Sequence, residues 1–313
     1  MPSERQAARL NPPALRSGDR VGIIAPASSF NRERFDVGCE TLRKMGYEPV
    51  FENSIFDRDL YFAGSTERRA REFEQMFVRD DIKAVICVRG GYGSNYLLPM
   101  LDIEKIAAHP KIFVGYSDLT TIMNWFGDAA GLVTFHGPMV AADFNRPDGV
   151  HLESWYAAVE RRDDWRLDFP AGSAVKSLVN GSAEGKLYGG CLSILVASLR
   201  TPWEIQTNHT ILFIEDVATK PYQIDRMLMH LKLAGKFAGV RGIIFGEMLD
   251  CAPAAGQNYS LEKVVMRVVG NLNVPVVYGL PSGHVAGANI TLPMGANVRL
   301  VANDSRVTLK MAD

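Results

Sequence analysis

Three residues at the ends of predicted strands carry side chains that together could catalyse acyl transfer. Ser117 follows the apolar run 112–115, Glu215 follows the run 210–214, and His284 lies in a loop after a further apolar run. In an open α/β sheet, ligands bind outside the carboxyl ends of the strands. A serine nucleophile, a histidine base and an orienting carboxylate are what acyl transfer requires. We therefore predict these three residues as nucleophile, acid and base.

Each of the three also has a plainer interpretation. Ser117 and Asp118 are residue types that cap helices, and a helix is expected to begin at 119. Glu215 fits a helix-entry acid satisfied by backbone N–H groups, and Glu247, at the end of another apolar run, is a rival acid. His284 fits an exposed loop histidine. The conjunction of the three, rather than any one of them, favours catalysis.

A glycine-rich loop, Arg89–Gly93, follows the strand predicted over 84–88. Its backbone N–H groups can approach an anion, either a phosphate or an oxyanion. The loop lacks the lysine of a P-loop and the spacing of a dinucleotide fingerprint, so it is a weak phosphate site. A plain tight turn fits this segment equally well.

The elements that must position these residues alternate in type along the first half of the chain. Short apolar runs are separated by segments with helical spacing, and the runs are 21–25, 47–51, 84–88 and 112–115. This alternation predicts a parallel sheet with right-handed crossovers. The stretch 146–183 is polar and is expected to be an irregular connection. The second half contains an amphipathic helix over 261–272 and ends in alternating, strand-like stretches.

Length and composition limit the class of protein. A chain of 313 residues suggests about two domains, and 47% hydrophobic with 22% charged residues is typical of a globular protein. The formal net charge of −1 gives no support for nucleic acid or an anionic membrane as a partner.

Targeting and metal signals are absent from the sequence. No secretory signal or membrane span is evident, so we expect a cytoplasmic protein. The four cysteines are scattered without a CxxC pair, and we expect them to be reduced and mostly buried. No HExxH or similar metal-ligand spacing occurs, so we do not expect a metal hydrolase.

Ordered blocks along nearly the whole chain resemble the LD-carboxypeptidase family, the murein tetrapeptide carboxypeptidases and their relatives. The blocks that carry this resemblance are Ala25–Ser28, Val88–Gly93, Gly115–Asp118, Phe135–Met139, Ile214–Asp216, Gly283–His284 and Leu292–Ala296.

The resemblance implies two domains of the α/β class. A flavodoxin-like domain with a parallel sheet would span 1–150, a connection 151–183, and a β-rich α/β domain 184–313. The family's nucleophile falls on Ser117 in the first domain. Its acid and base fall on Glu215 and His284 in the second, across an interdomain cleft.

The resemblance also implies the chemistry. The oxyanion hole would be formed by the N–H groups of Gly91 and Asp118. The substrate would be a murein peptide, from which the enzyme removes the terminal D-alanine during cytoplasmic peptidoglycan recycling. No cofactor or metal would be needed, and a homodimer is expected.

Two other functions stay open. A microcin immunity-type peptidase of the same fold would cleave peptidyl or acyl-sulfamoyl nucleotides. A non-catalytic protein of two lobes would close on a small ligand. The chain also departs from the family pattern, with Cys191 where asparagine is expected and Arg200 where glycine is expected. Both departures bear on local conformation or substrate contacts.

Overall fold

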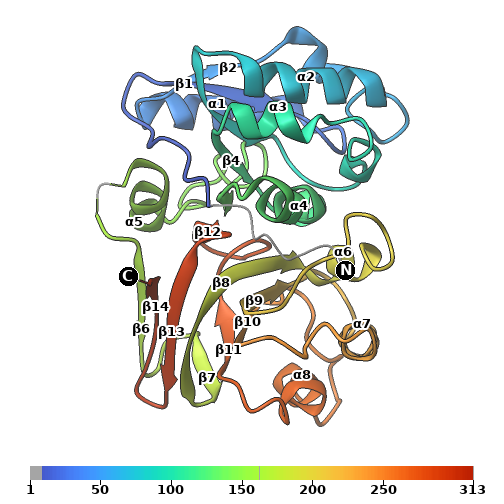
Figure 1. The fold of residues 1–313 in the computed structure, drawn as a ribbon, viewed down its shortest axis with the longest axis vertical. Helices are drawn as coiled ribbons and strands as arrows, with labels where there is room; N and C mark the ends of the chain where they lie inside the picture. Colours follow the sequence, from blue (N-terminus) through green and yellow to red (C-terminus); the bar gives the residue numbers. More distant parts are fainter. Residues whose placement is uncertain (1–8, 162, 313) are drawn as a thin grey trace.

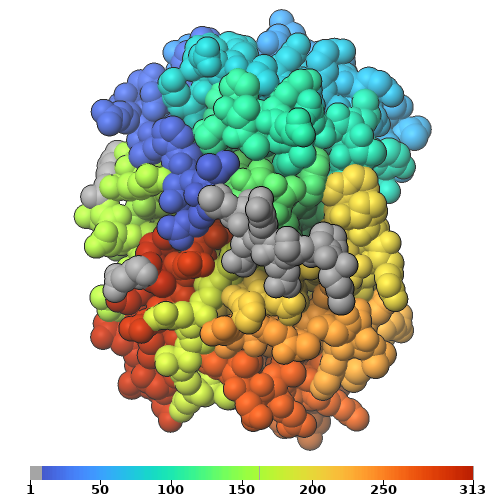
Figure 2. All heavy atoms as spheres, in the orientation of Figure 1, coloured from blue at the N-terminus to red at the C-terminus, as the bar shows by residue number. Residues whose placement is uncertain are grey.

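The computed structural model describes residues 9–161 and 163–312. Two sheets, each accompanied by helices, lie one above the other along the long axis of the molecule (Figure 1). The first described residues pack against the C-terminal segment, where the blue and red atoms meet in Figure 2. Each sheet with its helices forms one α/β layer, the fold class that the sequence predicted, and the two layers are in contact.

The first sheet is mostly parallel. Its order is β12-β5-β4-β3-β1-β2, and the neighbouring pairs among β1 to β5 are all parallel. This is the flavodoxin-like order 2-1-3-4-5, extended by the antiparallel strand β12. The strands are β1 (Arg20–Ile24), β2 (Glu48–Val50), β3 (Ile82–Cys87), β4 (Ile112–Gly115), β5 (Thr134–His136) and β12 (Leu292–Met294).

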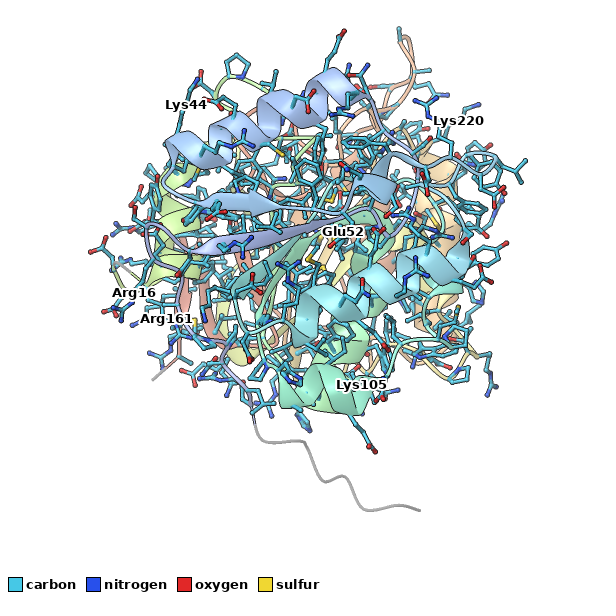
Figure 3. The ribbon with its side chains drawn as sticks, turned by 90° about the horizontal axis from the view of Figure 1, so that it is seen from above. Arg16, Lys44, Glu52, Lys105, Arg161 and Lys220 are labelled. Atoms are coloured by element: carbon cyan, nitrogen blue, oxygen red, sulfur yellow. The ribbon has the colours of Figure 1, made fainter. Side chains whose placement is uncertain are left out.

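Helices cover both faces of this sheet. Viewed from above, α1, which ends at Lys44, lies on one side of the strands, and α3, which carries Lys105, lies on the other (Figure 3). The helical segments of this half are α1 (Arg32–Lys44), η1 (Asn53–Phe56), α2 (Thr66–Val78), η2 (Ser94–Tyr96), α3 (Ile103–Ala108), η3 (Ser117–Leu119) and α4 (Thr120–Ala130).

The second sheet is mixed and larger. Its order is β6-β14-β13-β8-β9-β10-β11-β7, with β8 to β11 parallel and the remaining pairs antiparallel. Its strands are β6 (Arg166–Pro170), β7 (Lys176–Val179), β8 (Gly181–Cys191), β9 (Thr210–Glu215), β10 (Gly242–Gly246), β11 (Val276–Leu280), β13 (Asn297–Asn303) and β14 (Arg306–Met311). Its helices are α6 (Leu192–Ala197), α7 (Pro221–Leu233) and α8 (Leu261–Val269).

The stretch 146–183 is not irregular, and this expectation was wrong. It contains α5 (Leu152–Trp155), the π-helical segment η4 (Tyr156–Glu160) and the strands β6 and β7. These two strands are the opposite edges of the second sheet, and of their nine residues only Leu167 is buried. Edge exposure explains the polar sequence. The division at 150 and 183 stays a prediction.

The hydrophobic core continues from one sheet to the other. One cluster of buried side chains includes Phe135 of the first sheet together with Leu187 and Phe213 of the second. The four cysteines are free and buried, as predicted. In the described part of the chain, no helix is long and apolar enough to cross a membrane. Burial of these apolar side chains at the interface stabilises the contact between the two layers.

Helix α4 fixes the position of the first layer relative to the second. It lies at their boundary, packed on β8 and α6 (Figure 1). Asn124 donates to the carbonyl of Gly189 at 3.2 Å, and the N–H of Cys191 donates to Thr120 Oγ1 at 3.1 Å. The start of α4 is therefore tied to the second sheet.

Two helix glycines should respond oppositely to replacement by alanine. A Cβ at Gly38 in α1 would lie 2.1 Å from the carbonyl oxygen of Val140, whereas at Gly127 in α4 the nearest atom is 3.8 Å away. Gly38→Ala should lower the free energy of unfolding by about 1–3 kcal/mol through overpacking. Gly127→Ala should raise it by about 0.5–1 kcal/mol, since alanine loses less backbone entropy. Denaturant titration measures both, and equal effects would contradict the packing of α1.

Candidate active site

Ser117 lies on a strained turn at the end of β4. Its φ is +64°, in the left-handed region that a residue with a Cβ adopts at a cost. The short helix η3 begins at this serine and leads into α4. A serine on a strained strand-to-helix turn presents its hydroxyl above the sheet, which is how nucleophile elbows are built.

The capping interpretation of Ser117 and Asp118 is wrong. In the described chain, no side chain caps η3 or α4. The Asp118 carboxylate, which is 1% exposed, instead accepts the N–H of Ser94 at 2.7 Å. Ser117 contributes its carbonyl, which accepts the hydroxyl of Thr120 at 2.7 Å. The hydroxyl of Ser117 is thus left for another role.

The glycine-rich loop lies directly beside Ser117. A Cβ at Gly90 would be 2.8 Å from the Cβ of Ser117, 3.0 Å from its Oγ and 3.2 Å from the Asp118 nitrogen. Gly91 has a φ of +105°, and a Cβ there would be 2.4 Å from Ser28 Oγ. The Ser28 hydroxyl accepts the N–H of Tyr92 at 3.0 Å, which holds the loop in place. Any side chain at 90 or 91 would fill this space.

Glu215 and His284 form a hydrogen-bonded pair. The Oε2 atom of Glu215, which is 0% exposed, lies 2.7 Å from His284 Nδ1 and 3.1 Å from the His284 main-chain nitrogen. A carboxylate oxygen accepts here, so Nδ1 carries the proton and Nε2 is the lone-pair nitrogen. His284 is therefore a partly buried, oriented imidazole, and its interpretation as an exposed loop residue is wrong.

The charges of this pair stabilise each other. Burial lowers the pKa of His284, but the hydrogen bond and charge of Glu215 outweigh it, so the pKa is raised above 6.5. Burial likewise opposes ionisation of Glu215, yet its hydrogen bond with His284 leaves the pKa of the carboxyl below its ordinary value. Glu215 is consequently ionised next to a histidine that gains a proton readily.

The neighbouring acids have other partners. Asp216 takes the helix-entry role, because its carboxylate accepts the N–H of Ser193 at 2.9 Å and that of Val217 at 2.8 Å. Glu247, the rival acid, accepts the main-chain N–H of Ala286 at 3.3 Å. Of the candidate acids, Glu215 is the one that contacts His284.

Tyr116 connects the serine to the histidine. Its ring lies edge-on against the His284 ring, with centroids 5.1 Å apart. Since Tyr116 directly precedes Ser117, His284 from the second half of the chain lies beside the Ser117 turn of the first. The sequence placed both residues at strand ends, and the structure brings them to one place.

Arg146 holds the loop that carries His284, a role that was not predicted from the sequence. The Arg146 guanidinium donates to the carbonyls of Val285, Ala286 and Gly287 at 3.2–3.4 Å. It also pairs at 3.1 Å with Asp143, whose side chain is 2% exposed. The stretch around Arg146 carried no signal for this role, because the acceptors are main-chain oxygens that any sequence provides.

His136 is the second residue that sequence reasoning undervalued. It is 1% exposed, its ring lies 5.8 Å from that of Tyr116, and its Nδ1 is 2.9 Å from Ser282 Oγ. The Ser282 hydroxyl donates to the carbonyl of Ile290, so it accepts from His136. Burial lowers the pKa of His136 to about 4, which keeps it neutral. It is therefore a buried, neutral neighbour of Tyr116. In the described chain, no group of three or more His, Cys, Asp or Glu side chains is placed to hold a metal ion.

Known proteins match both halves of the chain. Residues 21–137 match the LD-carboxypeptidase N-terminal domain, and residues 184–300 match the LD-carboxypeptidase C-terminal domain. A probable murein peptide carboxypeptidase of Bacillus subtilis is 37% identical over 92% of this chain and 91% of its own length.

Solved structures agree with these matches. The muramoyltetrapeptide carboxypeptidase from Oxalobacter formigenes superposes with a TM-score of 0.83 at 30% identity, covering 94% of this chain and 99% of its own. The microcin C7 self-immunity protein MccF of Escherichia coli is 30% identical over 94% of each chain. In complex with aspartyl sulfamoyl adenosine, MccF has a TM-score of 0.87, at 27% identity over 97% of this chain and 99% of its own. The chain thus belongs to the LD-carboxypeptidase family of serine peptidases, peptidase family S66.

Proposed function

We propose that this protein is a serine LD-carboxypeptidase that removes the terminal D-alanine from a murein tetrapeptide. The observation that carries the proposal is the buried 2.7 Å pair of Glu215 and His284 beside the strained turn of Ser117. Relatives named as murein peptide and murein tetrapeptide carboxypeptidases support the substrate class. A cytoplasmic role in peptidoglycan recycling and a homodimer are parts of the same prediction.

In this proposal Ser117 Oγ attacks the amide carbonyl carbon while His284 Nε2 removes its proton. Glu215 holds the imidazole in the Nδ1–H tautomer and stabilises the imidazolium. The imidazolium then gives its proton to the departing amine, and water hydrolyses the acyl-enzyme with His284 again acting as base. Each proton that leaves Ser117 or water is therefore returned to a leaving group.

The oxyanion that forms during attack needs donors next to Ser117. We assign this role to the N–H groups of Asp118 and Gly91. The N–H groups of a first helical turn have no intrahelical acceptor, and Asp118 lies in the first turn of η3. Gly91 lies in the glycine-rich loop next to Gly90, at which a Cβ would be 2.8 Å from that of Ser117. Each donor contributes about 3–4 kcal/mol to the transition state.

A second candidate is cleavage of aminoacyl- or peptidyl-sulfamoyl nucleotides, which the likeness to MccF favours. Such a substrate needs an aromatic face for its base. Trp155 and Trp165 are buried and donate their indole N–H groups to Tyr47 and to the carbonyl of Thr291. Trp125 packs edge-on against Trp203. Two of the four tryptophans are thus enclosed, and this observation favours the peptide substrate.

Ser117→Ala should abolish turnover without unfolding the protein. Mass spectrometry of products from murein tetrapeptide and from a peptidyl-sulfamoyl adenylate should show loss of D-alanine from the first, and a fall of about 10⁴-fold or more in the variant. Ser260→Ala is the matched control: Ser260 caps α8, so its loss should cost about 1 kcal/mol of stability and leave turnover intact. Substantial turnover by Ser117→Ala would overturn the nucleophile assignment, and cleavage of the adenylate alone would favour the second candidate.

Glu215→Gln should slow the reaction far more than Glu247→Gln. Loss of the carboxylate that orients His284 removes up to about 10⁴-fold of kcat. Glu247 contacts the main-chain nitrogen of Ala286 rather than the imidazole, so its replacement should cost about 10-fold or less. Steady-state kinetics of the two variants decide between the acids. A small loss of kcat in Glu215→Gln together with a large loss in Glu247→Gln would show that the acid was wrongly chosen.

The pH dependence should report His284. The base must be neutral, so kcat/KM should rise with pH through the pKa of His284, which Glu215 raises above 6.5. In Glu215→Gln the negative charge is gone, and the ascending limb of the residual activity should move to lower pH. Profiles of the wild type and of this variant test the pairing. If the ascending limbs of the wild type and of Glu215→Gln had the same midpoint, a group other than His284 would be titrating.

A further inference from the structure

A carboxypeptidase must recognise the free carboxylate of the residue that it releases, and the following inference rests on the proposed function. That carboxylate carbon is three bonds from the carbonyl carbon that Ser117 would attack. The cation that binds it must therefore come from the residues surrounding the nucleophile. Arginine suits this task, because its planar guanidinium matches a carboxylate with two parallel hydrogen bonds.

Arg89 is an exposed cation in the glycine-rich loop that lies beside Ser117. It lies two residues after the end of β3 and directly precedes Gly90, at which a Cβ would be 2.8 Å from that of Ser117. One guanidinium nitrogen of Arg89 lies 3.5 Å from the position that a Cβ on Gly91 would occupy. The guanidinium thus lies over the same peptide segment that we assign to the oxyanion hole.

The guanidinium of Arg89 makes few polar contacts within the described part of the protein. Within residues 9–161 and 163–312 it makes one hydrogen bond, to the carbonyl oxygen of Ser29 at the limiting distance of 3.5 Å. Among the described residues, no carboxylate forms an ion pair with it. This leaves its charge and most of its N–H donors available for an anionic ligand.

The other arginines near the site are used by the fold. Arg69 is 1% exposed and donates to the carbonyls of Pro26 and Gly93 at 2.6 and 2.8 Å. Arg146 donates to the loop that carries His284. Neither can turn to a substrate without breaking these bonds. Arg89 differs from both in being exposed and uncommitted.

We propose that Arg89 binds the α-carboxylate of the terminal residue of the substrate and so makes the enzyme a carboxypeptidase rather than an endopeptidase. In this arrangement the carboxylate lies on the guanidinium beside Gly91. The scissile carbonyl then lies between Ser117 and the loop. Arg89 takes no part in proton transfer.

The test compares a tetrapeptide with a free terminal carboxylate and the same peptide with a terminal carboxamide. For the free acid, Arg89→Ala should lower kcat/KM by about 10–100-fold, mostly through KM, because a charge-assisted pair is lost. For the carboxamide, kcat/KM should change by less than about 3-fold. Arg89→Lys should recover part of the preference. Arg58→Ala, which removes an exposed arginine from a different loop, is the control and should leave both values unchanged.

Equal slowing of both peptides by Arg89→Ala would overturn the assignment, because it would show a structural or oxyanion role. Loss of the carboxylate preference in Lys220→Ala instead would also overturn it. Lys220, exposed at the start of α7, is the cation that follows Glu215 and Asp216 in the second half.

Calorimetric binding to the inactive Ser117→Ala protein separates this inference from the proposed function. The free acid should bind about 10–100-fold more tightly than the carboxamide, and adding Arg89→Ala should remove the difference. Failure of the wild type to cleave either peptide would contradict the proposed function alone. Equal affinity for acid and carboxamide would contradict the role of Arg89, whatever the turnover.

Discussion

The pairing of Glu215 with His284 is the constraint on which the site depends. A carboxylate with no exposed surface costs several kcal/mol unless donors replace its lost water. His284 supplies two of these donors, one from its ring and one from its main chain. The surroundings make room for the pair: a Cβ at Gly283 would lie 2.8 Å from the carboxyl carbon of Glu215, and one at Gly246 would lie 2.6 Å from its Cβ. The need to satisfy one buried charge therefore dictates glycine at two neighbouring positions.

The proposed base, His284, is anchored to both layers of the molecule. Just after the His284 loop, the chain enters β12, which pairs with β5 in the first sheet. Arg146 holds the carbonyls of the loop, and its partner Asp143 accepts the N–H of Met139 at 2.9 Å. His284 is thus attached to the first layer by a strand and by a side chain, while its partner Glu215 belongs to the second. These attachments position His284 beside Tyr116 in the structure as it stands.

The strands, the amphipathic helix and the strand-end location of the catalytic candidates were predictable, because each depends on a local pattern. Helix α8 begins at Leu261 as predicted and ends one residue before Gly270. The pairing of β12 with β5 was not predictable, because a three-residue strand has too few residues for a periodicity. The roles of Arg146 and His136 depend on main-chain oxygens and on burial, which appear only once the chain has folded. The sequence therefore indicated candidate reacting groups, whose roles stay a prediction, but not the residues that hold them.

The two departures from the family pattern have different physical consequences. Arg200 has a φ of +64°, so the structure retains the left-handed turn for which glycine is expected and accepts the strain of a side chain there. Cys191 pairs with Glu215 across β8 and β9, and its thiol lies 3.3 Å from the Ser193 hydroxyl. Burial raises the pKa of this thiol well above its ordinary value, so it is neutral and adds no charge next to Glu215. An amide at this position would also be neutral. The substitution thus preserves the electrostatics of the Glu215–His284 pair and removes one strong hydrogen-bonding group beside it.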